Sequence, residues 1–352
     1  MKALLVLEDG TYYQGTAFGK TGTTHGEVVF NTCMTGYQEV STDPSYRGQM
    51  VAMTYPLIGN YGFNQEDSES GEPQVRAFIV RELCDYPSNW RSSVPAGSFF
   101  TDHMGICDID TRHLTRHIRE QGSMYAVLTT ESEDIEALAG QARELAASPK
   151  QLVEEVTCTE PRLIEGEGPH VAVLDYGVKE NILRNLQKLG ARITVLPAHT
   201  TAEEVKALSP DGILLSNGPG DPQDIPYAIE TIKALMGYKP TLGICLGHQL
   251  LGLAMGTETY KLKFGHHGGN HPVKDLTTGR VYITSQNHNY VLNKDFSPDI
   301  TITHINLNDD TVEGFRHNQY PILSVQYHPE AAPGPLDSGY IFHQFFELIK
   351  AS

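Results

Sequence analysis

The second half of the chain alternates short apolar segments with segments of helical periodicity, and few folds accommodate that pattern. The apolar segments lack regular polar alternation, so they are typical of parallel strands that are buried on both faces. Repeated strand–helix units predict a doubly wound, mostly parallel sheet with functional residues at the carboxyl ends of its strands. The predicted strands comprise residues 171–175, 193–196, 212–216 and 241–244, and the predicted helices comprise residues 179–189, 203–208 and 227–236.

Further strands and a last helix continue this α/β domain to the end of the chain. We predict strands at residues 281–284, 300–306, 313–316 and 322–326, and a helix at residues 340–350. At 352 residues the chain exceeds what one hydrophobic core usually supports, so two domains are expected. We assign residues 169–352 to the α/β domain and residues 149–168, which are acidic and contain several proline and glycine residues, to a linker.

Residues 1–148 have a different pattern, and we predict that they form a smaller β-rich α+β domain. Short strands separated by turns are predicted here. A helix follows in residues 105–122, where Thr111 is the predicted cap, Leu114 and Ile118 form an apolar pair and Gly122 ends the helix. The predicted strands comprise residues 1–7, 12–18, 27–31, 49–55 and 76–83, and a second helix comprises residues 134–147.

The composition argues against several classes of protein. The formal net charge is −17, from 26 basic and 43 acidic residues, and we identify no lysine or arginine cluster, so a nucleic-acid partner is not expected. We find neither a signal peptide nor an apolar run of the roughly 18 residues that a membrane-spanning helix needs, and we expect a cytoplasmic protein without a membrane partner. The 5 cysteines are scattered and without C-x-x-C spacing, which predicts reduced thiols.

One cysteine lies where a predicted strand meets a predicted helix. Gly243 and Gly247 stand two residues on either side of Cys245, which is the spacing of a nucleophile elbow. The sulfur would lie at a helix N-terminus, where unpaired backbone N–H groups favour the thiolate over the thiol. The same pattern is compatible with a buried structural cysteine whose neighbouring glycines only permit close packing.

Two further segments could complete a catalytic site around such a cysteine. A predicted strand leads directly to His328, and Pro329 allows Glu330 to turn back and orient the imidazole as a general base. The Gly-Pro-Gly loop at residues 218–220 could present bare backbone N–H groups to an oxyanion. The alternatives are an ordinary histidine at a strand end and an ordinary turn after a strand.

These segments resemble a known family. Gly243-Ile-Cys-Leu-Gly-His-Gln, Ser216-Asn-Gly-Pro-Gly-Asp-Pro and Tyr327-His-Pro-Glu are similar to the three motifs of class I (triad-type) glutamine amidotransferases, which have a flavodoxin-like sheet. The likeness extends along nearly the whole chain to the glutamine-hydrolysing small subunits of carbamoyl-phosphate synthetase. The segments that carry it are residues 264–272, 285–288 and 329–335 in the second half, and residues 31–39, 43–46, 54–59 and 108–112 in the first.

The resemblance implies a role for each matching residue. Cys245 would attack the side-chain amide of glutamine to form a glutamyl thioester, His328 would transfer the protons, and Glu330 would orient His328. The N–H groups of Leu246 and Gly218 match the oxyanion-hole positions. The remaining glutamine-binding positions are Ser45, Gly220, Gln249, Asn287, Asn289 and Tyr290.

Two of these positions need comment. The resemblance places Ser45 of the N-terminal domain in the glutamine site, which no periodicity could have indicated. Asn289 stands where the family usually has glycine, and asparagine is the other residue that best tolerates a left-handed backbone, so a main-chain contact there could be preserved.

The resemblance also implies a partner. The chain contains neither a P-loop motif nor a dinucleotide-binding glycine motif, so ATP, Mg²⁺ and bicarbonate are expected on a large subunit and no cofactor on this chain. Ammonia would pass to that subunit, which makes carbamoyl phosphate for pyrimidine and arginine biosynthesis. We expect a heterodimer or a higher oligomer of it, with the N-terminal domain at the interface.

Other interpretations remain open. The histidines at residues 266, 267 and 271 could suggest a metal site, but no acidic or cysteine ligand lies near them in the sequence, and we expect no metal. An amidotransferase of another synthetase, a non-catalytic scaffold that retains the fold, and a cysteine hydrolase of peptides or esters are the alternative functions.

Overall fold

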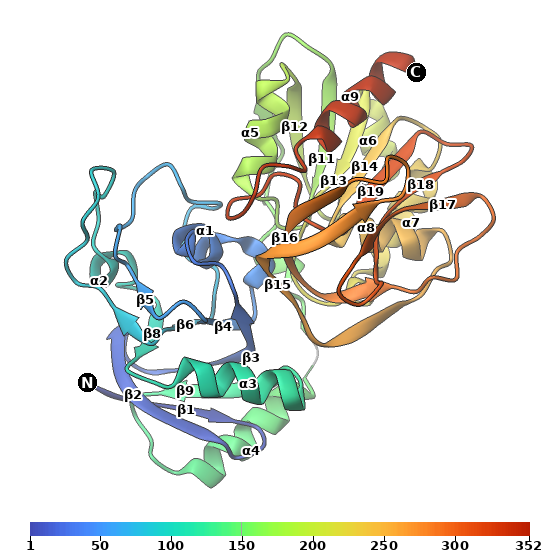
Figure 1. Ribbon diagram of the computed structural model, residues 1–352. Helices are drawn as coiled ribbons and strands as arrows, with labels where there is room; N and C mark the ends of the chain where they lie inside the picture. The colour runs from blue at the N-terminus through green and yellow to red at the C-terminus, as the bar shows by residue number, and fades with distance from the viewer. Residues whose placement is uncertain (149) are drawn as a thin grey trace. The chain divides into compact units, whose positions relative to one another are not determined.

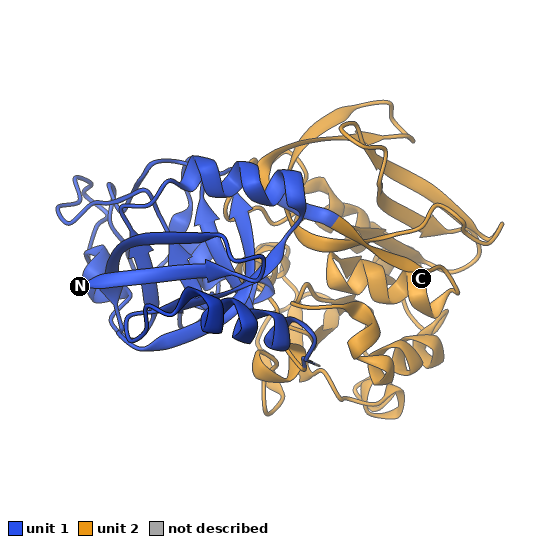
Figure 2. Ribbon diagram, turned by 90° about the horizontal axis from the view of Figure 1, so that it is seen from below, with its two compact units in different colours: residues 1–150, 263–267 blue, residues 151–262, 268–352 orange. Residues whose placement is uncertain are grey.

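The computed structural model describes residues 1–148 and 150–352, which divide into two compact units (Figure 2). Unit 1 comprises residues 1–150 and 263–267, and unit 2 comprises residues 151–262 and 268–352. Residue 149, the first of the predicted linker, lies outside the described residues.

Unit 1 is built on a closed barrel with the strand order β1-β2-β8-β6-β4-β3-β9 (Figure 1). The pairs β3·β4, β4·β6 and β6·β8 are parallel and the other pairs are antiparallel. Closure leaves no free sheet edge in the barrel. The barrel strands are β1 (Lys2–Leu7), β2 (Tyr12–Gly19), β3 (Thr23–Asn31), β4 (Gln49–Met53), β6 (Ala77–Ile79), β8 (Met104–Cys107) and β9 (Met124–Thr129).

Several of these elements were not predicted from the sequence. The segment 76–83, predicted as one strand, forms β6 and the separate β7 (Glu82–Leu83), which pairs in parallel with β5 (Leu57–Ile58) outside the barrel. The helix α1 (Tyr37–Thr42) and the strands β8 and β9 are also additional to the prediction. Short elements of this kind are stabilised by tertiary pairing, which local sequence patterns do not show.

The remaining helices of unit 1 are α2 (Ala96–Phe99), α3 (Thr111–Gln121) and α4 (Ile135–Ala146). Leu114 and Ile118 of α3 are fully buried in the barrel core, as their spacing predicts, and Gly122 ends the helix at φ 108°. The cap is Asp110 rather than Thr111, because the Asp110 carboxylate accepts a hydrogen bond from the backbone N–H of His113 at 2.9 Å. The predicted capping role of Thr111 was therefore wrong by one residue.

Unit 2 contains a ten-stranded sheet with the order β10-β12-β11-β13-β14-β19-β18-β17-β15-β16 (Figure 1). The strands from β12 to β19 in this order are parallel, so their carboxyl ends meet at one edge. The order reverses between β11 and β13, and sites of open α/β sheets lie at such a reversal. The strands are β10 (Arg162–Ile164), β11 (His170–Asp175), β12 (Arg192–Pro197), β13 (Gly212–Leu215), β14 (Thr241–Ile244), β15 (Thr259–Asp275), β16 (Val281–Leu292), β17 (Ile300–Asn306), β18 (Val312–His317) and β19 (Ile322–Val325).

One buried apolar cluster lies on each face of the parallel part of this sheet, and helices cover both faces. The doubly wound α/β prediction for the second half is therefore confirmed. The helices are α5 (Glu180–Lys188), α6 (Ala202–Ala207), α7 (Pro226–Leu235), α8 (Leu246–Ala254) and α9 (Tyr340–Ala351). Among the described residues, no helix has the length and apolar character needed to cross a membrane.

The segment 150–168 has more structure than a linker composition suggests. Val153 is buried in the core of unit 2, and β10 pairs antiparallel with β12 at the edge of the sheet. Gly166 passes so close to the backbone of Ala191 that a Cβ there would lie 2.1 Å from its carbonyl oxygen. The glycine and proline residues of this segment therefore permit close packing and turns within unit 2.

Candidate active site

Cys245 lies between β14 and α8 in a backbone conformation that few L-residues adopt. Its φ is 53° and its ψ is −103°, and such strained residues cluster at functional sites. A Cβ at Gly247 would lie 2.2 Å from the carbonyl oxygen of Leu215, and a Cβ at Gly243 would lie 2.6 Å from the Leu251 side chain. The tight strand-to-helix turn predicted from the glycine spacing is present, and both glycines are sterically required.

His328 and Glu330 follow β19 at the same carboxyl edge of the sheet. The backbone N–H of His328 donates to the carbonyl oxygen of Ser285 at 2.9 Å, which fixes the segment just beyond the strand. Nδ1 of His328 lies 2.7 Å from Oε1 of Glu330, and both side chains are buried. The structure therefore pairs the histidine with the acidic residue that the sequence analysis selected.

A buried lysine completes this group, and the sequence analysis missed it. Lys179 follows β11 and precedes α5, and it is 1% exposed. Its ammonium nitrogen lies 3.0 Å from Oε1 of Glu330 and also donates to the carbonyl oxygen of Ala331. Glu330 therefore lies between two cationic groups. The only sequence signal for Lys179 was its place just after a predicted parallel strand, where sites are expected.

These contacts keep the histidine and the carboxylate charged. Burial by itself raises the pKa of Glu330, but the charges of Lys179 and His328 outweigh it and lower this pKa to about 2. Burial by itself lowers the pKa of His328, but Glu330 and Cys245 outweigh it and raise this pKa to about 10. The surroundings of His328 and Glu330 therefore favour the charged form of each side chain.

The thiol of Cys245 has polar neighbours on two sides. Its Sγ lies 3.6 Å from the carbonyl oxygen of Asn287 and 3.7 Å from Nε2 of Gln326. The Gln326 amide can donate to a thiolate, and the sequence analysis missed this residue although it directly precedes the Tyr-His-Pro-Glu motif. The charge of Cys245 also contributes to the raised pKa of His328. Nε2 of His328 has no hydrogen-bond partner among the described residues, so the direct contacts of the thiol are those with Asn287 and Gln326.

Two backbone N–H groups near Cys245 have no hydrogen-bond partner in the described part of the chain. One belongs to Leu246, the first residue of α8, and the other belongs to Gly218 in the loop after β13. A Cβ at Gly218 would lie 2.2 Å from the carbonyl oxygen of Tyr176, so only glycine fits this approach. Free N–H groups of this kind are what an oxyanion hole requires.

Most of the predicted glutamine-binding residues lie in unit 2. Nε2 of Gln249 donates to the carbonyl oxygen of Tyr290 at 2.7 Å and to Oε1 of Gln326 at 3.1 Å, so its carbonyl oxygen points elsewhere and can accept from a ligand. Asn287 and Asn289 are buried in β16. Gly220 is exposed, with a φ of 90°.

Two predictions about these residues have different outcomes. Asn289 is not among the residues with positive φ, because it lies within the extended strand β16, so the left-handed backbone considered for it is not needed. Ser45 belongs to unit 1, where its backbone N–H donates to the Asp43 carboxylate at 2.9 Å. Its place in the glutamine site remains a prediction.

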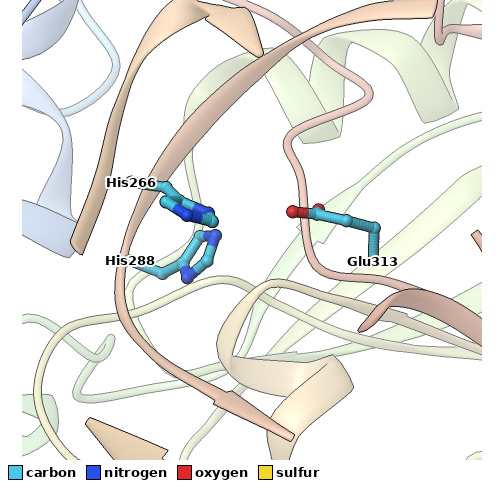
Figure 3. A group of neighbouring side chains, drawn as sticks. All are labelled: His266, His288 and Glu313. Carbon is cyan, nitrogen blue, oxygen red and sulfur yellow. The ribbon is translucent and has the colours of Figure 1, made fainter. Parts of the chain in front are cut away.

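A buried polar network in unit 2 bears on the question of a metal. Figure 3 shows His288 of β16 and Glu313 of β18; His266, also drawn there, belongs to unit 1. Gln286 donates to Oε2 of Glu313 at 3.0 Å and lies 2.8 Å from Nε2 of His288 through its own carbonyl oxygen. Asn306 donates to Oε1 of Glu313 at 3.0 Å. Amide groups therefore engage both oxygens of this carboxylate, and the expectation of no metal remains a prediction.

Comparison with known proteins finds similarity along both units. Residues 172–348 match the family described as Glutamine amidotransferase class-I, and residues 5–128 match the CPSase domain of the Carbamoyl-phosphate synthase small chain. The Carbamoyl phosphate synthase small chain of Oceanobacillus iheyensis is 52% identical over 355 residues, covering 100% of this chain and 97% of that protein. That of Clostridium perfringens is 52% identical and covers 99% of each chain. The Carbamoyl phosphate synthase pyrimidine-specific small chain of Bacillus subtilis is 49% identical and covers 100% of this chain and 97% of its own.

Proposed function

Since this chain belongs to the family of carbamoyl phosphate synthase small chains, we propose that it hydrolyses glutamine with Cys245, His328 and Glu330 as a catalytic triad. The observation that carries the proposal is the contact between Nδ1 of His328 and Oε1 of Glu330 at 2.7 Å, just beyond β19, which pairs in parallel with the strand β14 that leads to Cys245. A structural cysteine would need neither the histidine nor its buried carboxylate.

The first step forms a thioester. The thiolate of Cys245 attacks the side-chain amide carbon of glutamine, and the carbon–oxygen double bond becomes an oxyanion. His328, held as an imidazolium, delivers a proton to the amide nitrogen, the carbon–nitrogen bond breaks, and ammonia leaves. The products of this step are a γ-glutamyl thioester on Cys245 and a neutral His328.

The free N–H groups of Leu246 and Gly218 stabilise the oxyanion of this step. Both lie at the carboxyl edge of the sheet that also carries Cys245. An oxyanion-hole donor typically contributes a factor of about 10²–10³ to the rate. The exclusion of a side chain at Gly218 keeps that position open for the substrate.

The second step hydrolyses the thioester. Neutral His328 takes a proton from water, the hydroxide adds to the thioester carbon, and the bond from carbon to sulfur breaks. Glutamate leaves, and the side chains of Cys245 and His328 return to the state in which the first step began. Glu330 keeps the imidazole oriented in both steps, and Lys179 keeps Glu330 ionised.

The ammonia serves a second polypeptide. The small-chain naming of the relatives supports a large-chain partner, and we assign ATP, Mg²⁺ and bicarbonate to that chain. Ammonia released to solvent would be protonated and lose its nucleophilicity, so the transfer to the large chain is enclosed. Carbamoyl phosphate made by the complex supplies pyrimidine and arginine biosynthesis.

The test compares two cysteine variants in the complex with the large chain. Cys245→Ser is expected to abolish carbamoyl phosphate synthesis from glutamine while synthesis from ammonium chloride continues. Cys158→Ser is the matched control, because Cys158 is a half-buried thiol of the same unit. Glutamine-dependent synthesis by Cys245→Ser at the parent rate would show that Cys245 is not the nucleophile.

A further inference from the structure

A surface hollow of about 820 Å³ in unit 1 gathers four arginines. They are Arg81, Arg112, Arg116 and Arg119, which we call the arginine surface. The last three lie on the helix α3, which is labelled in Figure 1, and Arg81 lies about 30 residues earlier in the sequence, so only folding brings the four together. The statement that the chain has no basic cluster was therefore wrong for this part of unit 1.

Three of the arginines form a stripe along α3. Arg112, Arg116 and Arg119 are spaced by four and then three residues, so they lie on the same side of the helix. Arg81 joins them from the segment between β6 and β7. At a rise of about 1.5 Å per residue the stripe is roughly 10 Å long.

Little in unit 1 neutralises this charge. Among the described residues, the side chains of Arg112 and Arg119 have no hydrogen bond or ion pair, and the Arg116 side chain makes only an exposed contact with Glu120 at 3.6 Å. Asp110, the one acidic residue that lines the hollow in the described part of the chain, caps α3 instead. Like charges at this spacing destabilise a helix, and the chain as a whole has a net charge of −17. The arginine surface is therefore positively charged in an otherwise acidic chain, and the repulsion among its arginines lowers the stability of α3.

We propose that the arginine surface docks an acidic segment of the large chain, an inference that rests on the proposed function. The length of the stripe exceeds a single phosphate group, whereas several carboxylates along a polypeptide can each meet one guanidinium. Arginine matches carboxylate geometry and is enriched at the energetic centres of protein interfaces. Complementary charge also accelerates association, which suits a small chain that must find its partner.

The test is a double charge reversal, Arg112→Glu with Arg116→Glu, against a matched control. Lys188→Glu with Arg192→Glu makes the same charge change at exposed positions of unit 2. Association of each variant with the immobilised large chain is measured at about 50 mM and about 300 mM salt, because a charge-steered association slows as salt screens it. The glutaminase activity of each chain without the large chain is measured alongside.

The expected result is association at least about tenfold slower for the arginine variant, with a flatter salt dependence, and a control within about twofold of the parent. Glutaminase activity without the large chain is unchanged, which shows that the variant is folded. The neutral pair Arg112→Gln with Arg116→Gln gives an intermediate rate and serves if the reversed variant does not fold.

Three results would overturn the proposal in distinguishable ways. Association of both arginine variants at the parent rate removes the arginine surface from the interface while leaving the proposed function intact. If the parent chain associates with the large chain only when inorganic phosphate is added at constant ionic strength, the arginine surface binds a small anion instead. A parent chain that does not bind the large chain at all overturns the proposed function, and the docking proposal with it.

Discussion

Oε1 of Glu330 contacts both the ammonium nitrogen of Lys179 at 3.0 Å and Nδ1 of His328 at 2.7 Å. One buried carboxylate oxygen therefore connects a lysine after β11 to a histidine after β19. The lysine offsets the burial of Glu330, so that the carboxylate remains ionised and can orient the imidazolium.

We predict that Lys179→Met weakens both folding and catalysis. Removing one partner of a buried ion pair typically costs about 3–5 kcal/mol of stability, because a charge is left uncompensated. The pKa of Glu330 should rise and glutamine hydrolysis should fall. Denaturant unfolding and glutaminase assays check this, with Lys188→Met at an exposed position of α5 as the control. Equal stability of the two variants would contradict the role assigned to Lys179.

The pH dependence of stability follows from the two shifted pKa values. The pKa of His328 rises from 6.5 to about 10, so its stabilising contribution is complete below pH 6.5 and is lost as the pH rises through about 10. The pKa of Glu330 falls from 4.5 to about 2, so its contribution is complete above pH 4.5 and is lost as the pH falls through about 2.

The measurement for this prediction is the difference in melting temperature between the parent and His328→Asn across the pH range. The difference should be largest between pH 4.5 and pH 6.5 and should shrink toward pH 10. A difference that stays constant from pH 6.5 to pH 10 would show that His328 is not held in its charged form.

A third prediction concerns the glycines of the elbow. Gly247→Ala places a Cβ 2.2 Å from the carbonyl oxygen of Leu215, so the backbone of α8 must shift, at a cost of about 1–3 kcal/mol or more. Gly140→Ala is the control, because its nearest atom would lie 3.9 Å away on the Arg143 side chain. That change in α4 should stabilise the protein by up to about 1 kcal/mol. Urea titration of both variants checks the opposite signs.

Gln326 is predicted to support both the thiolate and the substrate site. Gln326→Leu removes the donor near Sγ of Cys245 and the acceptor for Gln249. Loss of a hydrogen bond to a charged group costs about 1.5–3 kcal/mol, which corresponds to roughly a 10- to 100-fold decrease in kcat/KM for glutamine. Gln187→Leu, at an exposed position of α5, should leave kcat/KM unchanged. A similar kcat/KM for the two variants would contradict this role.

Much of unit 2 could be predicted because its signals are local. The elbow needs only two glycines around Cys245, and the steric contacts at Gly243 and Gly247 explain why no other residue fits. The strand–helix alternation reflects burial on both faces of a parallel sheet, which leaves a continuous apolar run in each strand. The pairing of His328 with Glu330 is local too, because only a proline separates them.

Predictions from composition were incomplete where polar and glycine-rich segments pack against the rest of the fold. The linker prediction for residues 149–168 did not foresee that β10 adds to the sheet or that Val153 is buried. The cap of α3 was misplaced by one residue because Asp110 and Thr111 are both suitable capping residues. Hydrogen-bond geometry, which the sequence does not contain, distinguishes them.

Local order in the chain was enough to identify the α/β class and to propose Cys245 and His328 as nucleophile and base, because each of these inferences depends on residues a few positions apart. Contacts between distant segments emerged only on folding. The closure of the unit 1 barrel, the placement of Lys179 against Glu330 and the alignment of Arg81 with the α3 arginines each join parts of the chain that carry no mutual signal. Long-range pairing and burial position these groups, and neither follows from the identity of any single residue.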